Sequence, residues 1–221
     1  SAETLQQTGV RRLSEVSPKS VAEFRARIAQ DHGPVTSNRV IAMLRGMWSK
    51  AVKEWRTVES SPLDGLKLYP EAERERRLMP DEMARFLAAV RAEPDPFGDF
   101  FLLLLFTGQR RGNVQAMRWA QVNLDRAIWT VPAGETKTGR EYTVPLVAPA
   151  VEILARRRAG SRGAVYVFSS YGKAGHIADP KGAWRRVTRA ARLEDLRMHD
   201  LRRTLGSWMA DQQASLPTIG K

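Results

Sequence analysis

Four cationic positions could act together on a phosphate group. Arg110 follows the tight turn at Thr107 and Gly108, Lys137 lies in a polar loop, and His199 and Arg202 are spaced so that they share a face of a helix. The guanidinium group of arginine stays protonated and can bind two phosphate oxygens at once. Taken singly, residues of these types are usually solvated surface. Their chemistry therefore depends on the elements that bring them together.

The charge balance of the chain points to a polyanionic partner. Its 221 residues include 36 Lys and Arg against 24 Asp and Glu, which gives a formal net charge of +12 and a pI near 10.6. Such an excess favours nucleic-acid binding. The longest apolar run, 100–106, is too short to span a membrane, and the N-terminus shows no signal-peptide pattern. We therefore expect a cytoplasmic, nucleoid-associated protein without a membrane partner.

The amino-acid composition also excludes several kinds of site. The sequence has no cysteine, so disulfide scaffolds, zinc sites built on cysteine and thiol nucleophiles are ruled out. His32 and His176 have no motif around them, and we interpret both as ordinary surface residues.

Changes in pattern divide the chain into two expected domains. Residues 1–65 favour two helices, at about 17–29 and from a cap at Thr36 or Ser37, and the Ser-, Pro- and Gly-containing stretch 60–65 ends this region. Residues 66–79 are charged and unpatterned, which is typical of a linker. Residues 80–221 form the second domain. The formal charges of these three segments are +3, +1 and +8, so the second domain should dominate the electrostatic potential.

The second helix of the first domain has a strong apolar pattern. Its apolar residues recur at spacings of three, four, seven and eight, and we expect all of them in the core: Val40, Met43, Leu44, Met47, Trp48, Ala51, Val52 and Trp55. The opposite face carries Arg39, Arg45, Lys50 and Lys53. We interpret this charged face as an ordinary solvated helix surface, unless DNA binding is indicated elsewhere in the chain.

The second domain mixes helical and strand patterns. Alternating residues predict two strands at 127–131 and 142–146, joined as a hairpin by the polar loop 134–140. A short third strand is expected at 165–168. Helical patterns cover 83–90, 97–106, 113–119, 149–158, 181–192 and a last segment from about His199. The fold class is therefore mainly α with a small β-sheet, an α+β arrangement.

Three motifs surround the four cationic residues. The first reads TGQRRGNV at 107–114, the second reads TKTGR at 136–140 and leads into TVPL, and the third reads HDLRRT at 199–204. In this order they resemble the first arginine box, the lysine hairpin and the His-x-x-Arg box of the tyrosine recombinases, the phage-integrase family. The resemblance covers nearly the whole chain.

The resemblance implies both a fold and a reaction. The family combines a helical core-binding domain with a mixed catalytic domain, and together they form a C-shaped clamp on duplex DNA at a recombination core site. A tyrosine attacks a phosphodiester and leaves a 3′-phosphotyrosine and a free 5′-hydroxyl. The family completes strand exchange as a tetramer on two sites, and it uses no cofactor and no metal.

The family register also assigns roles to residues of this chain. Arg110 and Arg202 would clamp the phosphate and stabilise the transition state, Lys137 would protonate the leaving 5′-oxygen, and His199 would orient the phosphate or transfer a proton. Asn113 stands where the family usually has glutamate, so its amide could support an arginine or a histidine but supplies no charge. The expected DNA contacts are Arg39, Arg45, Lys50, Arg111, Arg140 and Arg203, with Arg111 and Arg203 at the DNA backbone or the edge of the core.

The nucleophile of the family has no counterpart in this sequence. The family places its tyrosine some tens of residues after the His-x-x-Arg box, whereas Tyr69, Tyr142, Tyr166 and Tyr171 all precede His199. Tyr171 lies in a Gly- and Ser-rich turn and is a poor substitute. Residues 6–18 resemble the stretch after the first helix of the family's core-binding domain. We therefore expect a chain that is incomplete at both ends and binds DNA without cleaving it.

Two alternatives come from other functional classes. The chain could be a non-catalytic, sequence-tolerant DNA-binding module, or a metal-dependent nuclease or transposase, which requires clustered carboxylates. Covalent trapping on nicked DNA separates the recombinase from the binding module, and sensitivity to EDTA identifies the metal-dependent enzyme.

Overall fold

The computed structural model describes residues 13–136 and 138–211, and the chain divides into two compact units. The N-terminal unit is Ser1–Arg74 and the C-terminal unit is Glu75–Lys221. Each unit has a hydrophobic core of its own. Within the described residues, no helix combines the length and the apolar character that crossing a bilayer requires.

The N-terminal unit consists of η1 (Leu13–Glu15), α2 (Pro18–His32) and α3 (Pro34–Lys53). Ser17 caps α2 as expected, because its hydroxyl accepts a hydrogen bond from the Ser20 amide at 3.2 Å. The cap expected for α3 at Thr36 or Ser37 was wrong. The helix follows Gly33, whose φ of 86° suits glycine, and Ser37 is buried with its hydroxyl donating to the carbonyl of Arg25.

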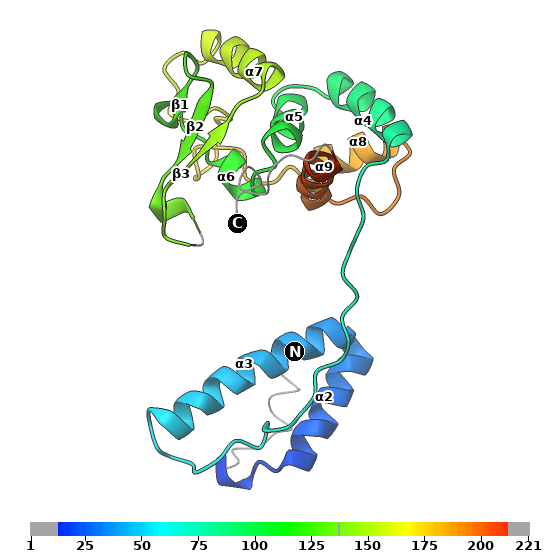
Figure 1. Ribbon diagram of the computed structural model, residues 1–221, viewed down its shortest axis with the longest axis vertical. Helices are drawn as coiled ribbons and strands as arrows, with labels where there is room; N and C mark the ends of the chain where they lie inside the picture. The colour runs from blue at the N-terminus through cyan, green and yellow to red at the C-terminus, as the bar shows by residue number, and fades with distance from the viewer. Residues whose placement is uncertain (1–12, 137, 212–221) are drawn as a thin grey trace. The chain divides into compact units, whose positions relative to one another are not determined.

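The apolar stripe of α3 is only partly in the core. Ile41, Trp48 and Ala51 are buried, but Met43, Met47 and Trp55 are 59%, 54% and 61% exposed, so their expected burial was wrong. The buried side also contains Asn38. Its Nδ2 donates to the carbonyl of Tyr69 at 2.8 Å, and its Oδ1 accepts from the Tyr69 amide at 2.9 Å. The chain after α3 returns beside the two helices (Figure 1) and determines which side of α3 is enclosed.

The C-terminal unit combines helices with a small sheet, which confirms the expected α+β class. Its elements are α4 (Pro80–Ala92), α5 (Phe97–Thr107), α6 (Arg111–Gln115), η2 (Trp119–Gln121), β1 (Val122–Asn123), β2 (Ile128–Val131), η3 (Ala133–Glu135), β3 (Tyr142–Pro145), α7 (Ala148–Ala159), α8 (Lys181–Ala190) and α9 (Met198–Asp211).

The sheet is antiparallel with the strand order β1-β2-β3. The expected hairpin is present, and Tyr142 at the start of β3 pairs with Val131 at the end of β2. The third strand is β1, which pairs with β2. The strand expected at 165–168 was wrong, since Tyr166 makes only an isolated bridge to Arg118. Two residues beyond this bridge, Phe168 is buried in the core.

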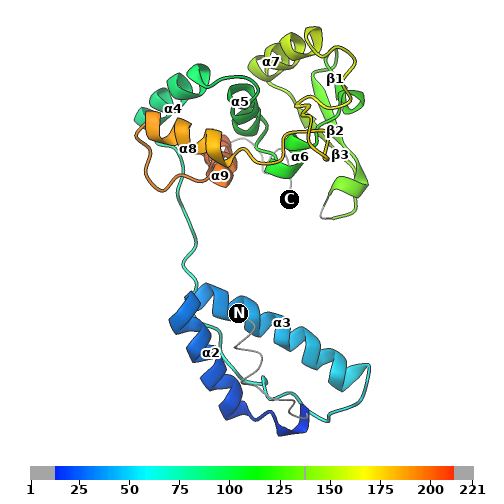
Figure 2. The same cartoon turned by 180° about the vertical axis from the view of Figure 1, so that it is seen from behind.

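Helix α5 forms the centre of the C-terminal unit. In both Figure 1 and Figure 2 it lies between the sheet on one side and α4 with α8 on the other. Aromatic rings fill its surroundings, with Phe101 in edge contact with Trp184 at 5.1 Å and Phe100 with Phe168 at 5.4 Å between ring centroids. Helix α9 also packs on α5. The end of α5 and the start of α9 are therefore anchored to one core.

Candidate functional site

Arg110 lies in the short connection between α5 and α6. Gly108 caps the C-terminus of α5 with a left-handed φ of 58°, and a Cβ atom there would lie 2.8 Å from Cδ2 of Leu205 on α9. Glycine therefore permits both the turn and the close approach of α9. The carbonyl of Arg110 accepts hydrogen bonds from the amides of Asn113 and Val114, at 3.0 and 3.2 Å. The backbone at Arg110 is held on both sides.

His199 and Arg202 are positioned by the first turns of α9. Asp200 is fully buried, and one of its oxygens accepts a hydrogen bond from the Arg197 amide at 2.8 Å. The other oxygen is 3.0 Å from Nη1 of Arg203. Leu201 is buried in the core beside them. These anchors fix the rotation of α9, so the face with His199 and Arg202 is directed away from the core.

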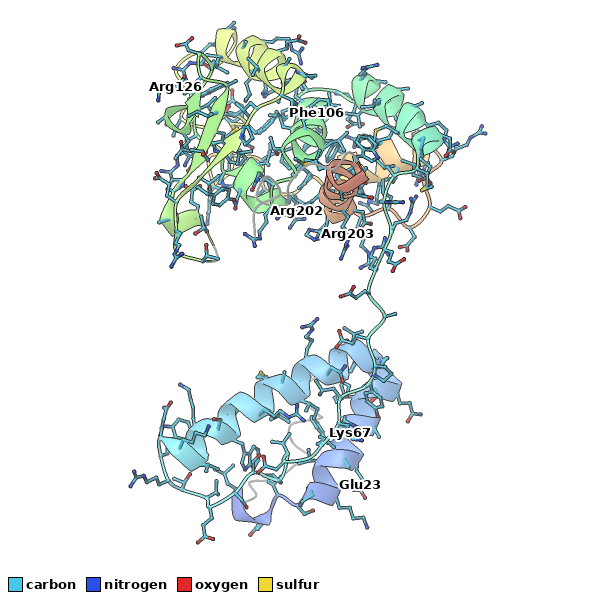
Figure 3. The ribbon with its side chains drawn as sticks, in the orientation of Figure 1. Glu23, Lys67, Phe106, Arg126, Arg202 and Arg203 are labelled. Carbon is cyan, nitrogen blue, oxygen red and sulfur yellow. The ribbon has the colours of Figure 1, made fainter. Side chains whose placement is uncertain are left out.

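Arg202 connects α9 to the turn before Arg110. Its Nη1 donates to the carbonyl oxygen of Gly108 at 2.6 Å. Figure 3 labels Arg202 and Arg203 on α9, and Phe106 near the end of α5. Burial lowers the pKa of the Arg202 guanidinium, and the positive charge of Arg110 lowers it further. Arginine nevertheless remains protonated in proteins. The fold therefore holds two like charges close enough to repel each other.

Both arginines line a cavity of about 420 Å³. Its walls come from the end of α5 and the following turn, from β3 and the segment leading into it, and from α9. Arg140, an expected DNA contact, lines the same cavity. The structure therefore brings together three cationic residues that are widely separated in the sequence. An anion entering this cavity would reduce the repulsion between Arg110 and Arg202.

The environment of His199 favours its neutral form. The side chain is exposed at the surface, but neighbouring protein atoms remove part of its hydration, and this is the largest cause of a lowered pKa. The positive charges of Arg203 and Arg202 lower the pKa of His199 further. The neutral imidazole is therefore favoured over the charged form, and it can accept a proton or a hydrogen bond.

Two side chains that flank Arg110 bind the same tyrosine. Asn113 Nδ2 donates to Tyr142 Oη at 3.2 Å, and the Tyr142 hydroxyl donates to Gln109 Oε1 at 2.7 Å. The family register predicts that Asn113 supports an arginine or a histidine, whereas the structure gives its amide a tyrosine partner. The roles of Gln109 and Tyr142 were not expected. No local pattern indicates them, because their partners lie in different elements.

The other expected contact residues lie in varied settings. Arg111 is exposed at the start of α6, and Arg203 pairs with Asp200. On α3, Arg39 Nη2 lies 3.6 Å from a Glu71 oxygen, Lys50 pairs with Glu54 at 4.0 Å, and Arg45 donates to the carbonyl of Leu66. Arg45 thus also stabilises the returning segment of the N-terminal unit. Lys137 lies outside the described residues.

The described part of the chain contains no group of three or more His, Asp or Glu side chains that could hold a metal ion. Asp99 contacts Arg156 and Arg157.

Comparison with known proteins identifies related sequences. The model described as "Phage integrase family" matches residues 76–221. The shufflon-specific DNA recombinase of Escherichia coli is 30% identical over 202 residues, covering 87% of this chain and 50% of the relative. The integrase of Salmonella phage P22 is 25% identical, covering 80% of this chain and 47% of the relative. The chain thus spans about half the length of these curated relatives.

Solved structures share the fold at low sequence identity. The Tn1549 transposon integrase in complex with circular intermediate DNA matches with a TM-score of 0.77 and 15% identity, over 96% of this chain and 78% of that one. A lambda integrase tetramer bound to a Holliday junction matches with a TM-score of 0.71 and 19% identity, over 96% and 66%.

Proposed function

Because the chain belongs to the phage integrase family, the tyrosine recombinases, we propose that it acts in site-specific DNA recombination by holding a DNA phosphodiester at Arg110 and Arg202. The observation that supports this most directly is the pairing of the two guanidinium groups at one cavity, where Arg110 lowers the pKa of Arg202. Two fixed cations are suited to a phosphate whose negative charge increases during reaction. The proposed partner is duplex DNA at a core site.

The proposed reaction is the transfer of a DNA strand to a tyrosine. The phenol gives up its proton as its oxygen forms a bond to phosphorus, the bond from phosphorus to the 5′-oxygen breaks, and the leaving oxygen takes a proton. Arg110 and Arg202 stabilise the charge on the non-bridging oxygens, and neutral His199 orients the phosphate or shuttles a proton. By family analogy Lys137 is the acid that protonates the 5′-oxygen. Exchange of strands would require a tetramer on two sites.

The proposal places the nucleophile outside these 221 residues. Among the tyrosines before His199, Tyr142 has its hydroxyl engaged with Gln109 and Asn113, and Tyr171 is fully exposed in its turn. An attacking oxygen must be held near and in line with the leaving oxygen. We therefore propose that this chain binds and polarises the phosphodiester without forming a covalent bond, and competes with a complete recombinase for its site.

Covalent trapping tests this function. A labelled suicide substrate is incubated with the chain, and in parallel with a form extended by a tyrosine-bearing C-terminal segment, and both are analysed on denaturing gels. We expect a covalent band only from the extended form. A band from the chain alone that Tyr171→Phe abolishes would show that the nucleophile was misplaced. Absence of a band from both forms would favour a DNA-binding module, and cleavage sensitive to EDTA would favour a metal-dependent nuclease.

The role of Lys137 has a separate test. In the extended form, Lys137→Ala should lose cleavage on ordinary DNA and recover it when the leaving 5′-oxygen is replaced by sulfur, because a thiolate leaves without a proton. If the sulfur substrate does not restore cleavage, Lys137 is not the acid.

A further inference from the structure

Arg110 is flanked by two residues that converge on one oxygen atom. Gln109 precedes it and Asn113 begins the next turn, and both side chains bind Oη of Tyr142, at 2.7 and 3.2 Å. Tyr142 lies on β3, so these bonds cross from the arginine loop to the sheet. The hydroxyl donates its one proton to Gln109 and accepts from Asn113. Its hydrogen-bonding capacity is therefore largely used within the protein.

The sheet provides a fixed anchor for this oxygen. Tyr142 pairs with Val131, and the neighbouring residues Trp129, Val131 and Val144 are buried in the core. In contrast, Arg110 itself is exposed and precedes α6, a helix of only five residues. Backbone bonds at the start of α6 hold the main chain of Arg110, but they do not join it to the cavity wall. Tyr142 lines the cavity and connects the Arg110 turn to the sheet side of its wall, in addition to the bond from Arg202 on α9 to the carbonyl of Gly108.

We propose that Tyr142 is a positioning residue for Arg110, and that the Tyr142 clasp, formed by Gln109, Asn113 and Tyr142, fixes this arginine at the cavity. The inference rests on the proposed function, in which Arg110 binds the phosphate. Asn113 stands where the family usually has glutamate, and the clasp gives that amide a function that needs no charge. When the backbone around Arg110 is held in place, the arginine loses less conformational freedom on meeting its phosphate.

The effect of Arg110 on His199 offers a readout in the unliganded chain. Burial is the largest cause of the lowered pKa of His199 and the positive charge of Arg110 is a minor one, so Arg110→Ala should raise that pKa slightly. If the clasp holds Arg110 in place, Tyr142→Phe should also raise the pKa of His199. In an Arg110→Ala background, Tyr142→Phe should cause no further change in that pKa. Proton NMR can follow the titration, since the chain has 3 histidines and His199→Gln assigns the signal.

Tyr166→Phe is the matched control. It removes a hydroxyl from another tyrosine of the same unit, whose ring contacts His176, and should leave the titration of His199 unchanged. If the pKa of His199 rises in Arg110→Ala but not in Tyr142→Phe, the proposal is overturned, because a merely structural tyrosine would not move this pKa. Equal rises in both tyrosine variants would also overturn it.

Amide hydrogen exchange gives a second, independent measurement. Loss of the clasp should increase exchange at residues 109–115 by roughly five- to a hundredfold, the range expected for losing the net contribution of the two hydrogen bonds that the hydroxyl makes. Unchanged exchange in Tyr142→Phe would refute the clasp even if Arg110→Ala did not alter His199. Neither measurement uses DNA. Failure of the proposed function would appear separately, as unchanged DNA binding and cleavage in Arg110→Ala and Arg202→Ala.

Discussion

The two units differ in how completely they enclose their apolar residues. In the N-terminal unit a small buried cluster of Val21, Ile41, Trp48 and Leu63 joins two helices and a returning segment. In the C-terminal unit a large cluster surrounds α5 and reaches the sheet, α8 and α9. An extensive core fixes the residues at its edge as well, and Gly108 and Arg202 lie at such an edge. The expected chemistry therefore lies in the unit that is better able to hold it rigidly.

Core truncation should show this difference most strongly. Phe101→Ala removes a completely buried ring and should destabilise the C-terminal unit by about 3–5 kcal/mol. Met47→Ala removes an exposed side chain and should change the stability of the N-terminal unit by less than about 0.5 kcal/mol. Amide exchange followed in each unit at increasing urea concentration measures both changes in unfolding free energy. Similar losses in the two units would contradict the assignment of Met47 to the surface.

Arginine substitutions should separate catalysis from binding. In a form that carries the nucleophile, Arg110→Ala or Arg202→Ala should reduce cleavage by about 100- to 1,000-fold, while DNA affinity falls much less, because their charge matches the transition state better than the ground state. Arg39→Ala and Lys50→Ala in the N-terminal unit should lower affinity only. The measurements are the single-turnover cleavage rate and the equilibrium DNA affinity of each variant, compared with those of the unsubstituted form. Equal losses in binding and cleavage for Arg110→Ala would rule out this division.

The same glycine substitution should have opposite signs in the two units. Gly108→Ala places a Cβ in a left-handed turn and against Leu205, and should destabilise the C-terminal unit by at least about 1–2 kcal/mol. Gly46→Ala lies within α3, where nothing beyond the adjacent helix backbone is within 4 Å of the added Cβ, and should stabilise the N-terminal unit by about 0.5–1 kcal/mol. Denaturant midpoints test both. Destabilisation by Gly46→Ala would indicate that this face of α3 is covered.

The smallest expected effect is a dependence of stability on pH. The pKa of His199 is lowered from its ordinary value of 6.5 on folding, so the unfolded chain binds this proton more readily than the folded chain. The contribution of His199 to stability is therefore complete above pH 6.5, and it falls as pH drops toward the folded pKa. His199→Gln should flatten this part of the profile for the C-terminal unit. An identical profile in the variant would contradict the shift.

Much of the fold was predictable where local pattern and core agree. The expected hairpin, the apolar helix at 97–106 and the helix from about His199 correspond to β2 with β3, α5 and α9. In α3 the same reasoning placed Met43 and Met47 in the core, although both are exposed. Periodicity shows that a helix has an apolar side, but it does not show how much of that side a neighbouring segment will cover. Asn38 and the returning chain decide that.

The sequence by itself determined the chemistry available to this protein: its positive charge, the order of its three motifs, and the residues Arg110, Lys137, His199 and Arg202. Only the tertiary structure decided how Arg110 and Arg202 are held. The bond from Arg202 to Gly108 and the Tyr142 clasp join residues 94, 29 and 33 positions apart. Such contacts leave no periodic signal, because each partner satisfies the pattern of its own helix, turn or strand, and packing of those elements alone brings them within hydrogen-bonding distance.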